Sequence, residues 1–116
     1  MINKIVKPTL VLNKKIALNN IKKQIQISRK NNIILRPHFK THQSLEIGTW
    51  FKSLGIKKIT VSSLKMAEYF SAQWDDITLA FPVNIREIKT INTLLSSITL
   101  NLLLESVFVL KFLEKI

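Results

Sequence analysis

The sequence predicts an α/β fold in which a leading strand and helix precede about four strand-then-helix units. Three observations support this fold class. Short apolar runs alternate with segments of helical periodicity, the connections between them are short, and no Gly/Pro-rich linker divides the 116 residues. Such an order implies right-handed crossovers and a parallel sheet. A chain of this length forms one domain at most.

The elements at the start of the chain are a strand at residues 9–12 and a helix that ends near Asn31 and Asn32. The first strand of the repeated units is expected at residues 33–40, which are apolar and β-branched at their beginning. Pro37 prevents a continuous helix through this run, because proline lacks the backbone N–H and clashes with the preceding turn. We therefore interpret the run as a strand.

The remaining units follow the same pattern. A helix over 44–55 begins with Ser44 as its N-cap and ends at Gly55, which supplies the left-handed conformation common at helix ends. The other three units, in chain order, are strand 58–62 with helix 64–73, strand 76–81 with helix 84–95, and strand 97–104 with helix 107–115.

Alternation along the predicted strand 33–40 separates a polar from an apolar face. Arg36, His38 and Lys40 share one face, while Pro37 and Phe39 lie on the other. The polar face leads toward the carboxyl end, where α/β sheets and barrels place their ligand sites. Lys40 is therefore a candidate amine nucleophile. The alternative from the pattern alone is an ordinary solvated lysine at the end of a strand.

The segment Arg36-Pro37-His38-Phe39-Lys40-Thr41-His42 resembles a motif of the D-threonine aldolase and D-serine dehydratase family, Arg-Pro-His-x-Lys-Thr-His. Segments at 8–12, 60–63, 67–68 and 76–82 also resemble that family, in the same order and at similar separations. The resemblance is most specific around Lys40 and becomes looser after Val83.

This resemblance implies the amino-terminal half of an alanine racemase-like (β/α)8 TIM barrel over residues 1–116, without the carboxyl-terminal half of the barrel or the carboxyl-terminal β domain. It also implies pyridoxal phosphate as cofactor and Lys40 as its Schiff-base lysine. The expected activity is that of a D-threonine aldolase, a lyase that cleaves β-hydroxy-D-amino acids to glycine and an aldehyde. Alternatives are a D-serine dehydratase or amino-acid racemase fragment, or a non-enzymatic remnant or basic binding module. Alone, the chain is expected to be incomplete and inactive.

The resemblance suggests further roles for residues near Lys40. His38 and His42 are expected to contact the cofactor, although packing and hydrogen bonding at a strand end is an equal alternative. Members of the family use a divalent metal whose ligands lie in the β domain, so we expect no metal ligands in this chain. For Arg36 the expected partner is Glu68 or Glu105. Hydroxyl groups of Ser62, Ser63 and Ser106 could donate to a phosphate, but helix capping is the preferred interpretation.

Charge and hydropathy limit the expected partners and location. The net charge of +11 is spread over lysine pairs without an arginine-rich run, and Lys, Ile and Asn share A/T-rich codons, so we expect no specific nucleic acid. The longest apolar run, 100–110, is too short and too interrupted to span a membrane. No signal peptide or cysteine is seen, and a cytoplasmic location is expected. Expected partners are a D-amino acid and either a second copy of the chain or the missing carboxyl-terminal half, because strand 97–104 would have an open edge.

Overall fold

The computed structural model describes residues 4–115, and the chain divides into two units, Met1–Ile33 and Ile34–Ile116. The described part of the first unit contains one helix, α1 (Lys14–Lys30). Asn13 caps this helix by accepting a hydrogen bond from the backbone N–H of Ile16 at 3.1 Å. The chain leaves the helix through Asn32, whose φ of 54° lies in the left-handed region that asparagine tolerates.

The second unit is built around a sheet of three parallel strands in the order β1-β2-β3. The strands are β1 (Ile59–Val61), β2 (Asp76–Pro82) and β3 (Thr99–Leu103). Thr60 is in register with Thr78, and Thr78 with Asn101. The pairing register of β2 and β3 shifts between Leu79 and Pro82. Pro82 has no backbone N–H to donate to a neighbouring strand.

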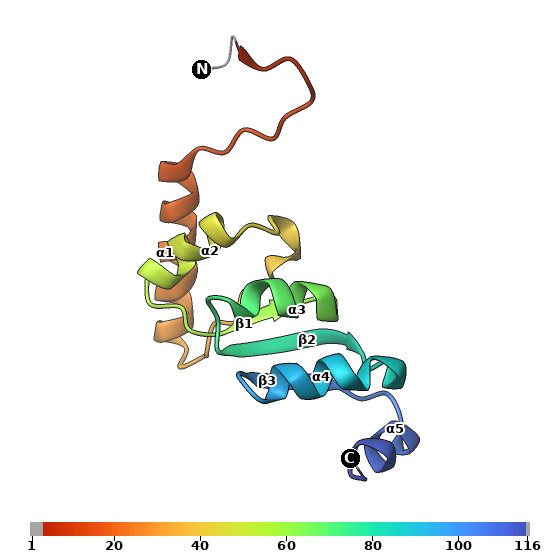
Figure 1. Ribbon diagram of the computed structural model, residues 1–116. Helices are drawn as coiled ribbons and strands as arrows, with labels where there is room; N and C mark the ends of the chain where they lie inside the picture. The colour runs from red at the N-terminus through yellow and green to blue at the C-terminus, as the bar shows by residue number, and fades with distance from the viewer. Residues whose placement is uncertain (1–3, 116) are drawn as a thin grey trace. The chain divides into compact units, whose positions relative to one another are not determined.

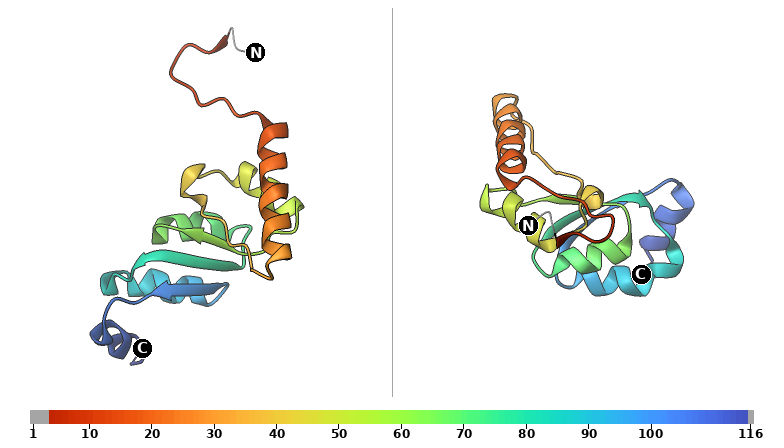
Figure 2. Two further views of the ribbon diagram at one scale, coloured as in Figure 1. Left: turned by 180° about the vertical axis from the view of Figure 1, so that it is seen from behind. Right: turned by 90° about the horizontal axis from the view of Figure 1, so that it is seen from above.

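Four α-helices accompany the sheet: α2 (Leu45–Ser53), α3 (Leu64–Ser71), α4 (Ile88–Leu95) and α5 (Val107–Leu113). Two short 3-10 helices are also present: η2 (Phe39–Thr41) precedes α2, and η3 (Ile85–Glu87) precedes α4. Figures 1 and 2 show α3 and α4 side by side on one face of the sheet, and both contact its strands. They pack there because their apolar sides meet the apolar side chains of the strands.

The core between the sheet and these helices is apolar. Alternate residues of β1 and β2, namely Ile59, Val61, Ile77 and Leu79, are buried, and Ala67, Phe70 and Ile91 of the helices are buried as well. On the strands, the residues between these apolar positions are Thr60, Asp76 and Thr78. By the alternation of a strand, these polar side chains lie on the face away from α3 and α4.

The helix ends follow the sequence prediction closely. The hydroxyl oxygens of Ser44, Ser63 and Ser106 each accept a hydrogen bond from a backbone N–H of the first turn, at 3.2 to 3.3 Å. Gly55 follows α2 with a φ of +88°, which a residue with a Cβ rarely adopts. The predicted caps of α2, α3 and α5 are therefore confirmed.

Two predicted strands are wrong. Residues 9–12 form no strand in the described part of the chain, and Leu10, Val11 and Leu12 are all exposed. Residues 33–40 contribute only an isolated parallel bridge between His38 and Thr60. An apolar β-branched run favours an extended backbone, but it becomes a strand only where a neighbour pairs with it. Three strand-then-helix units are present instead of the four predicted, and the α/β class with a parallel sheet is confirmed.

Within residues 4–115, no helix combines the length and apolar character that crossing a bilayer requires. The cytoplasmic location and the assignment of 1–116 to one partial domain remain predictions.

Candidate functional site

Lys40 lies in a tight turn and not on a strand, contrary to the sequence prediction. Its neighbour two residues earlier, His38, is bridged in parallel to Thr60, the middle residue of β1. The chain therefore turns near the carboxyl end of β1, and Lys40 belongs to this 3-10 turn, η2, which contacts β1. The side chain is exposed. The strand that was expected to carry Lys40 is missing, and the turn that carries it lies near the carboxyl end of β1.

His38 is the half-buried histidine beside this turn. Its Nδ1 accepts a hydrogen bond from the backbone N–H of Lys40 at 3.3 Å. Desolvation by burial, and next the charge of Lys40, lower the pKa of His38 below its ordinary value of 6.5. The neutral ring then carries its proton on Nε2, because Nδ1 is the acceptor. His38 can therefore offer an N–H donor to an anionic group near Lys40.

Phe39, between these two residues, is completely buried. Its ring lies 5.1 Å from that of Phe51, 5.0 Å from Phe70 and 5.2 Å from Trp74, measured between centroids. Gly48 of α2 permits this approach, because a Cβ at that position would come within 3.3 Å of the Phe39 ring. The aromatic cluster anchors the turn through the buried ring of Phe39, while Lys40 is exposed.

His42 belongs to the aromatic cluster and not to the exposed side of the turn. Its ring centroid is 4.4 Å from that of Phe39, and its Nε2 is buried without a hydrogen-bond partner. Its Nδ1 accepts from the backbone N–H of Ser44 at 3.1 Å. Burial lowers the pKa of His42 below its ordinary value of 6.5. These surroundings match the packing alternative, and the cofactor contact remains an untested prediction.

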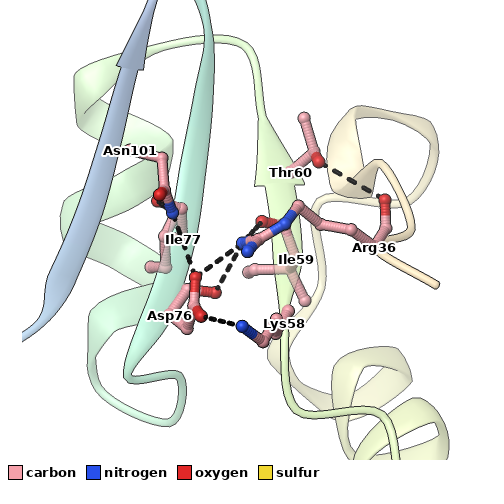
Figure 3. A network of polar contacts seen from close by, with 7 residues as sticks. All are labelled: Arg36, Lys58, Ile59, Thr60, Asp76, Ile77 and Asn101. Carbon is pink, nitrogen blue, oxygen red and sulfur yellow. Dashed lines mark hydrogen bonds and ion pairs between the residues drawn. The ribbon is translucent and has the colours of Figure 1, made fainter. Parts of the chain in front are cut away.

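Arg36 is held by Asp76, the first residue of β2, and not by the predicted Glu68 or Glu105. Its Nη1 donates to Asp76 Oδ1 at 2.6 Å (Figure 3). Both glutamates are exposed. The hydrogen bond from Arg36, together with the ammonium group of Lys58, lowers the pKa of Asp76 to about 2, although desolvation opposes this. Sequence reasoning missed Asp76 because only the strand register brings it near Arg36.

An open cavity of about 540 Å³ adjoins the Lys40 turn. Its walls include Gln43 from the loop after the turn, Ser63, which caps α3, and Lys65 and Tyr69 of α3. Gln43 has a left-handed φ of 47°, and its side-chain amide donates to the carbonyl of Lys40 at 3.3 Å. The cavity therefore lies at the same carboxyl edge of the sheet as Lys40.

The serines considered as phosphate donors differ in their bonding. Ser63 and Ser106 are helix caps, whereas Ser62 donates to the sulfur of Met66 at 3.5 Å, a weak bond. A cap uses only an oxygen lone pair, so the O–H groups of Ser63 and Ser106 are still able to donate to a ligand, and Ser62 can do so by giving up its weak bond. Across residues 4–115, no three His, Asp or Glu side chains gather closely enough to hold a metal ion.

The known proteins that this chain resembles, in sequence and in structure, include D-amino acid dehydratases. The chain is 30% identical over 93 residues to a D-serine dehydratase from Dictyostelium discoideum, a match that covers 76% of this chain and 24% of that protein. No family model matches. The solved D-threo-3-hydroxyaspartate dehydratase from a Delftia species superposes with a TM-score of 0.81 and 28% identity over 89% of this chain and 28% of that one.

A cysteine-to-alanine variant of a D-threo-3-hydroxyaspartate dehydratase, solved in its metal-free form, gives a TM-score of 0.83 with 29% identity. That match covers 91% of this chain and 28% of the other. The chain thus spans about a quarter of the length of the relatives it matches. Over this part, the resemblance predicted from the sequence is confirmed.

Proposed function

We propose that this chain, a partial relative of the D-serine and D-threo-3-hydroxyaspartate dehydratases, is the segment of a pyridoxal-phosphate lyase that carries the cofactor-binding lysine. The relatives that support the proposal are dehydratases. They favour the dehydratase alternative over the aldolase that the sequence motif first suggested. The proposed substrate is a β-hydroxy-D-amino acid, from which the complete enzyme would eliminate water.

The observation that carries the proposal is the placement of Lys40. Its backbone is held by the burial of Phe39 on one side, while its side chain extends into solvent at the carboxyl edge of the sheet. An aldehyde cofactor needs an accessible amine at a fixed position, and a lysine in such a place meets that need.

The residues around Lys40 fit pyridoxal phosphate in part. Lys40 would attach its aldehyde, and the Nε2–H of His38 and the hydroxyl of Ser62 are available as donors to an anionic group. When bound, the cofactor withdraws electrons from the bonds at the α-carbon of an amino acid. His38, neutral at pH 7, would donate a hydrogen bond without adding positive charge beside the amine. The divalent metal implied by the family has no ligand set among the described residues.

We also propose that the three strand-then-helix units and the Lys40 segment form part of a (β/α)8 barrel. The sheet supports this, because α3 and α4 cover one face and the polar residues Thr60, Asp76 and Thr78 alternate with the buried apolar ones on the strands, as the interior of a barrel that holds a ligand would require. The relatives are about four times as long as the matched segment. The remaining units, on this chain's natural extension or on a partner, would complete the cofactor site, so we expect little activity from residues 1–116 alone.

The proposal is tested by adding pyridoxal phosphate to the full 116-residue chain and recording the visible absorption band of the attached cofactor. Lys40→Ala should remove most of the band. Lys65→Ala, which removes an exposed lysine at the wall of the neighbouring cavity, should leave it nearly unchanged. Equal bands in the wild type and Lys40→Ala would contradict the proposed role of Lys40.

A further inference from the structure

Asp76 joins three other segments of the chain through its carboxylate. Oδ1 accepts from Arg36 at 2.6 Å and from the side-chain amide of Asn101 at 3.1 Å, while Oδ2 accepts from Lys58 at 2.9 Å (Figure 3). Arg36 precedes the Lys40 turn, Lys58 precedes β1, and Asn101 belongs to β3. One carboxylate on β2 therefore holds donors from β3, from the residue before β1 and from the segment that precedes the Lys40 turn.

The contact with Arg36 reaches across a strand. Arg36 lies before the bridge between His38 and β1, and its Nη1 also approaches the carbonyl oxygens of Ile59 and Asp76, at 3.4 Å each. The side chain thus passes over the beginning of β1 to reach β2, as Figure 3 shows. Such a contact ties the Arg36 backbone to two strands at once.

The contact between Arg36 and Asp76 is important because the segment before Lys40 forms few backbone hydrogen bonds of its own. Thr60 donates its N–H to the carbonyl of Pro37 at 2.8 Å and its hydroxyl to the carbonyl of Arg36 at 3.3 Å. In the described structure, His38–Thr60 is the one bridge of this segment. A single bridge fixes a backbone weakly, since an ordinary strand is held by several such pairs.

We propose that Asp76 is a positioning residue: by holding Arg36 it fixes the backbone register that presents Lys40 at the carboxyl edge of the sheet. The inference rests on the proposed function only for the role of the Lys40 amine. Arg36 fixes the segment four residues before Lys40, and buried Phe39 fixes it immediately before. A charge-assisted bond such as that to Arg36 is about twice as strong as a neutral one, so it adds to the few backbone pairs of this segment.

The test compares Asp76→Asn with Asp75→Asn in the full chain. Asp75 is an exposed neighbour, so its substitution makes the same change in charge without removing the Arg36 contact. The first measurement is amide hydrogen exchange at Thr60, whose N–H bonds to Pro37. Asp76→Asn should accelerate this exchange about tenfold, the scale of losing a hydrogen bond to a charged group, and amides within α4 should exchange as before. Asp75→Asn should change neither.

The second measurement is the amount of pyridoxal phosphate attached to Lys40 relative to Lys65 in the same molecules, determined by reduction and peptide mapping. Asp76→Asn should lower this ratio about tenfold, and Asp75→Asn should leave it unchanged. Arg36→Gln removes the same ion pair but leaves Asp76 bound to Lys58 and Asn101. It should reproduce both effects, and it replaces Asp76→Asn should that variant fail to fold.

Two results would overturn the inference and leave Asp76 a general structural role. One is uniformly faster amide exchange over the whole sheet. The other is a ratio of attachment at Lys40 to attachment at Lys65 that is the same in all variants. A wild-type chain without preferential attachment at Lys40 would instead contradict the proposed function. In that case faster exchange confined to Thr60 would still support the positioning of the segment by Asp76.

Discussion

Phe39 and Lys40 are adjacent in the sequence but have opposite surroundings. The ring of Phe39 is fully buried among aromatic side chains, whereas Lys40 is exposed. Because the two side chains leave a tight turn in different directions, anchoring the first also determines where the second is presented. The packing of Phe39 therefore helps to determine where the proposed cofactor-binding amine of Lys40 lies.

We predict that Phe39→Ala lowers the free energy of unfolding by about 3 to 5 kcal/mol, because it leaves a cavity in the aromatic cluster. Phe81→Ala is the matched control. Phe81 is 61% exposed, so its truncation should cost less than about 1 kcal/mol. Urea denaturation followed by fluorescence of the two tryptophans measures both changes. Similar costs for the two variants would mean that Phe39 does not anchor the turn.

At single positions, the sequence predicted which residues lie around the turn better than it predicted the side chains that they contact. Lys40, His38 and Arg36 were singled out from a short motif, and all three lie around one turn and its approach. The partner of Arg36 could not be predicted, because a long flexible side chain can reach across a strand and the register that brings Asp76 within 2.6 Å is a tertiary property. His42 could not be assigned to either side of the turn from its spacing alone.

The alternation of helices and strands was predicted well from periodicity, since β1, β3 and the helices α2 to α5 lie within the expected ranges and β2 extends one residue beyond its range, to Pro82. The two strands that failed, at 9–12 and 33–40, show the limit of this reasoning. Local sequence specifies an extended backbone, but pairing depends on whether a neighbour offers its backbone groups in register.

The network around Asp76 predicts a defined pH dependence for the stability of the sheet. The pKa of Asp76 is lowered from 3.8 to about 2 in the folded chain, chiefly by the hydrogen bond from Arg36. Its contribution should therefore be fully present above about pH 4 and should be lost as the pH falls toward 2. Urea denaturation of the wild type, Asp76→Asn and Asp75→Asn between pH 2 and 5 measures this contribution.

The difference in stability between the wild type and Asp76→Asn should shrink as the pH falls through this range. The difference between the wild type and Asp75→Asn should be small at every pH. A gap between the wild type and Asp76→Asn that stays constant down to pH 2 would contradict the account of this network.

For the molecule as a whole, the region of β3 and α5 exposes a group of apolar side chains. Leu103, Val107, Phe108 and Leu110 are 48%, 66%, 69% and 42% exposed. β3 is also an edge strand of the sheet. Exposed apolar surface beside an open edge favours association with another chain, in agreement with the expected second copy or missing part of a barrel.

We predict that the chain self-associates with rising concentration and that Phe108→Lys weakens this association about tenfold, because it places a charge in the apolar group. Ile27→Lys, at a residue of α1 that is 54% exposed, provides the matched control and should have little effect. Sedimentation velocity over a range of concentrations distinguishes the two. A monomer at all concentrations, or equal effects of the two substitutions, would contradict this prediction.

The most direct test of the central claim, that Lys40 is the cofactor-binding amine, is to map where pyridoxal phosphate attaches. The chain, with its 15 lysines, is mixed with less than one equivalent of pyridoxal phosphate, reduced with borohydride, digested and analysed by mass spectrometry. The account predicts that Lys40 carries most of the label, well above exposed lysines such as Lys65 and Lys111. Label distributed among the lysines with no excess at Lys40 would contradict it.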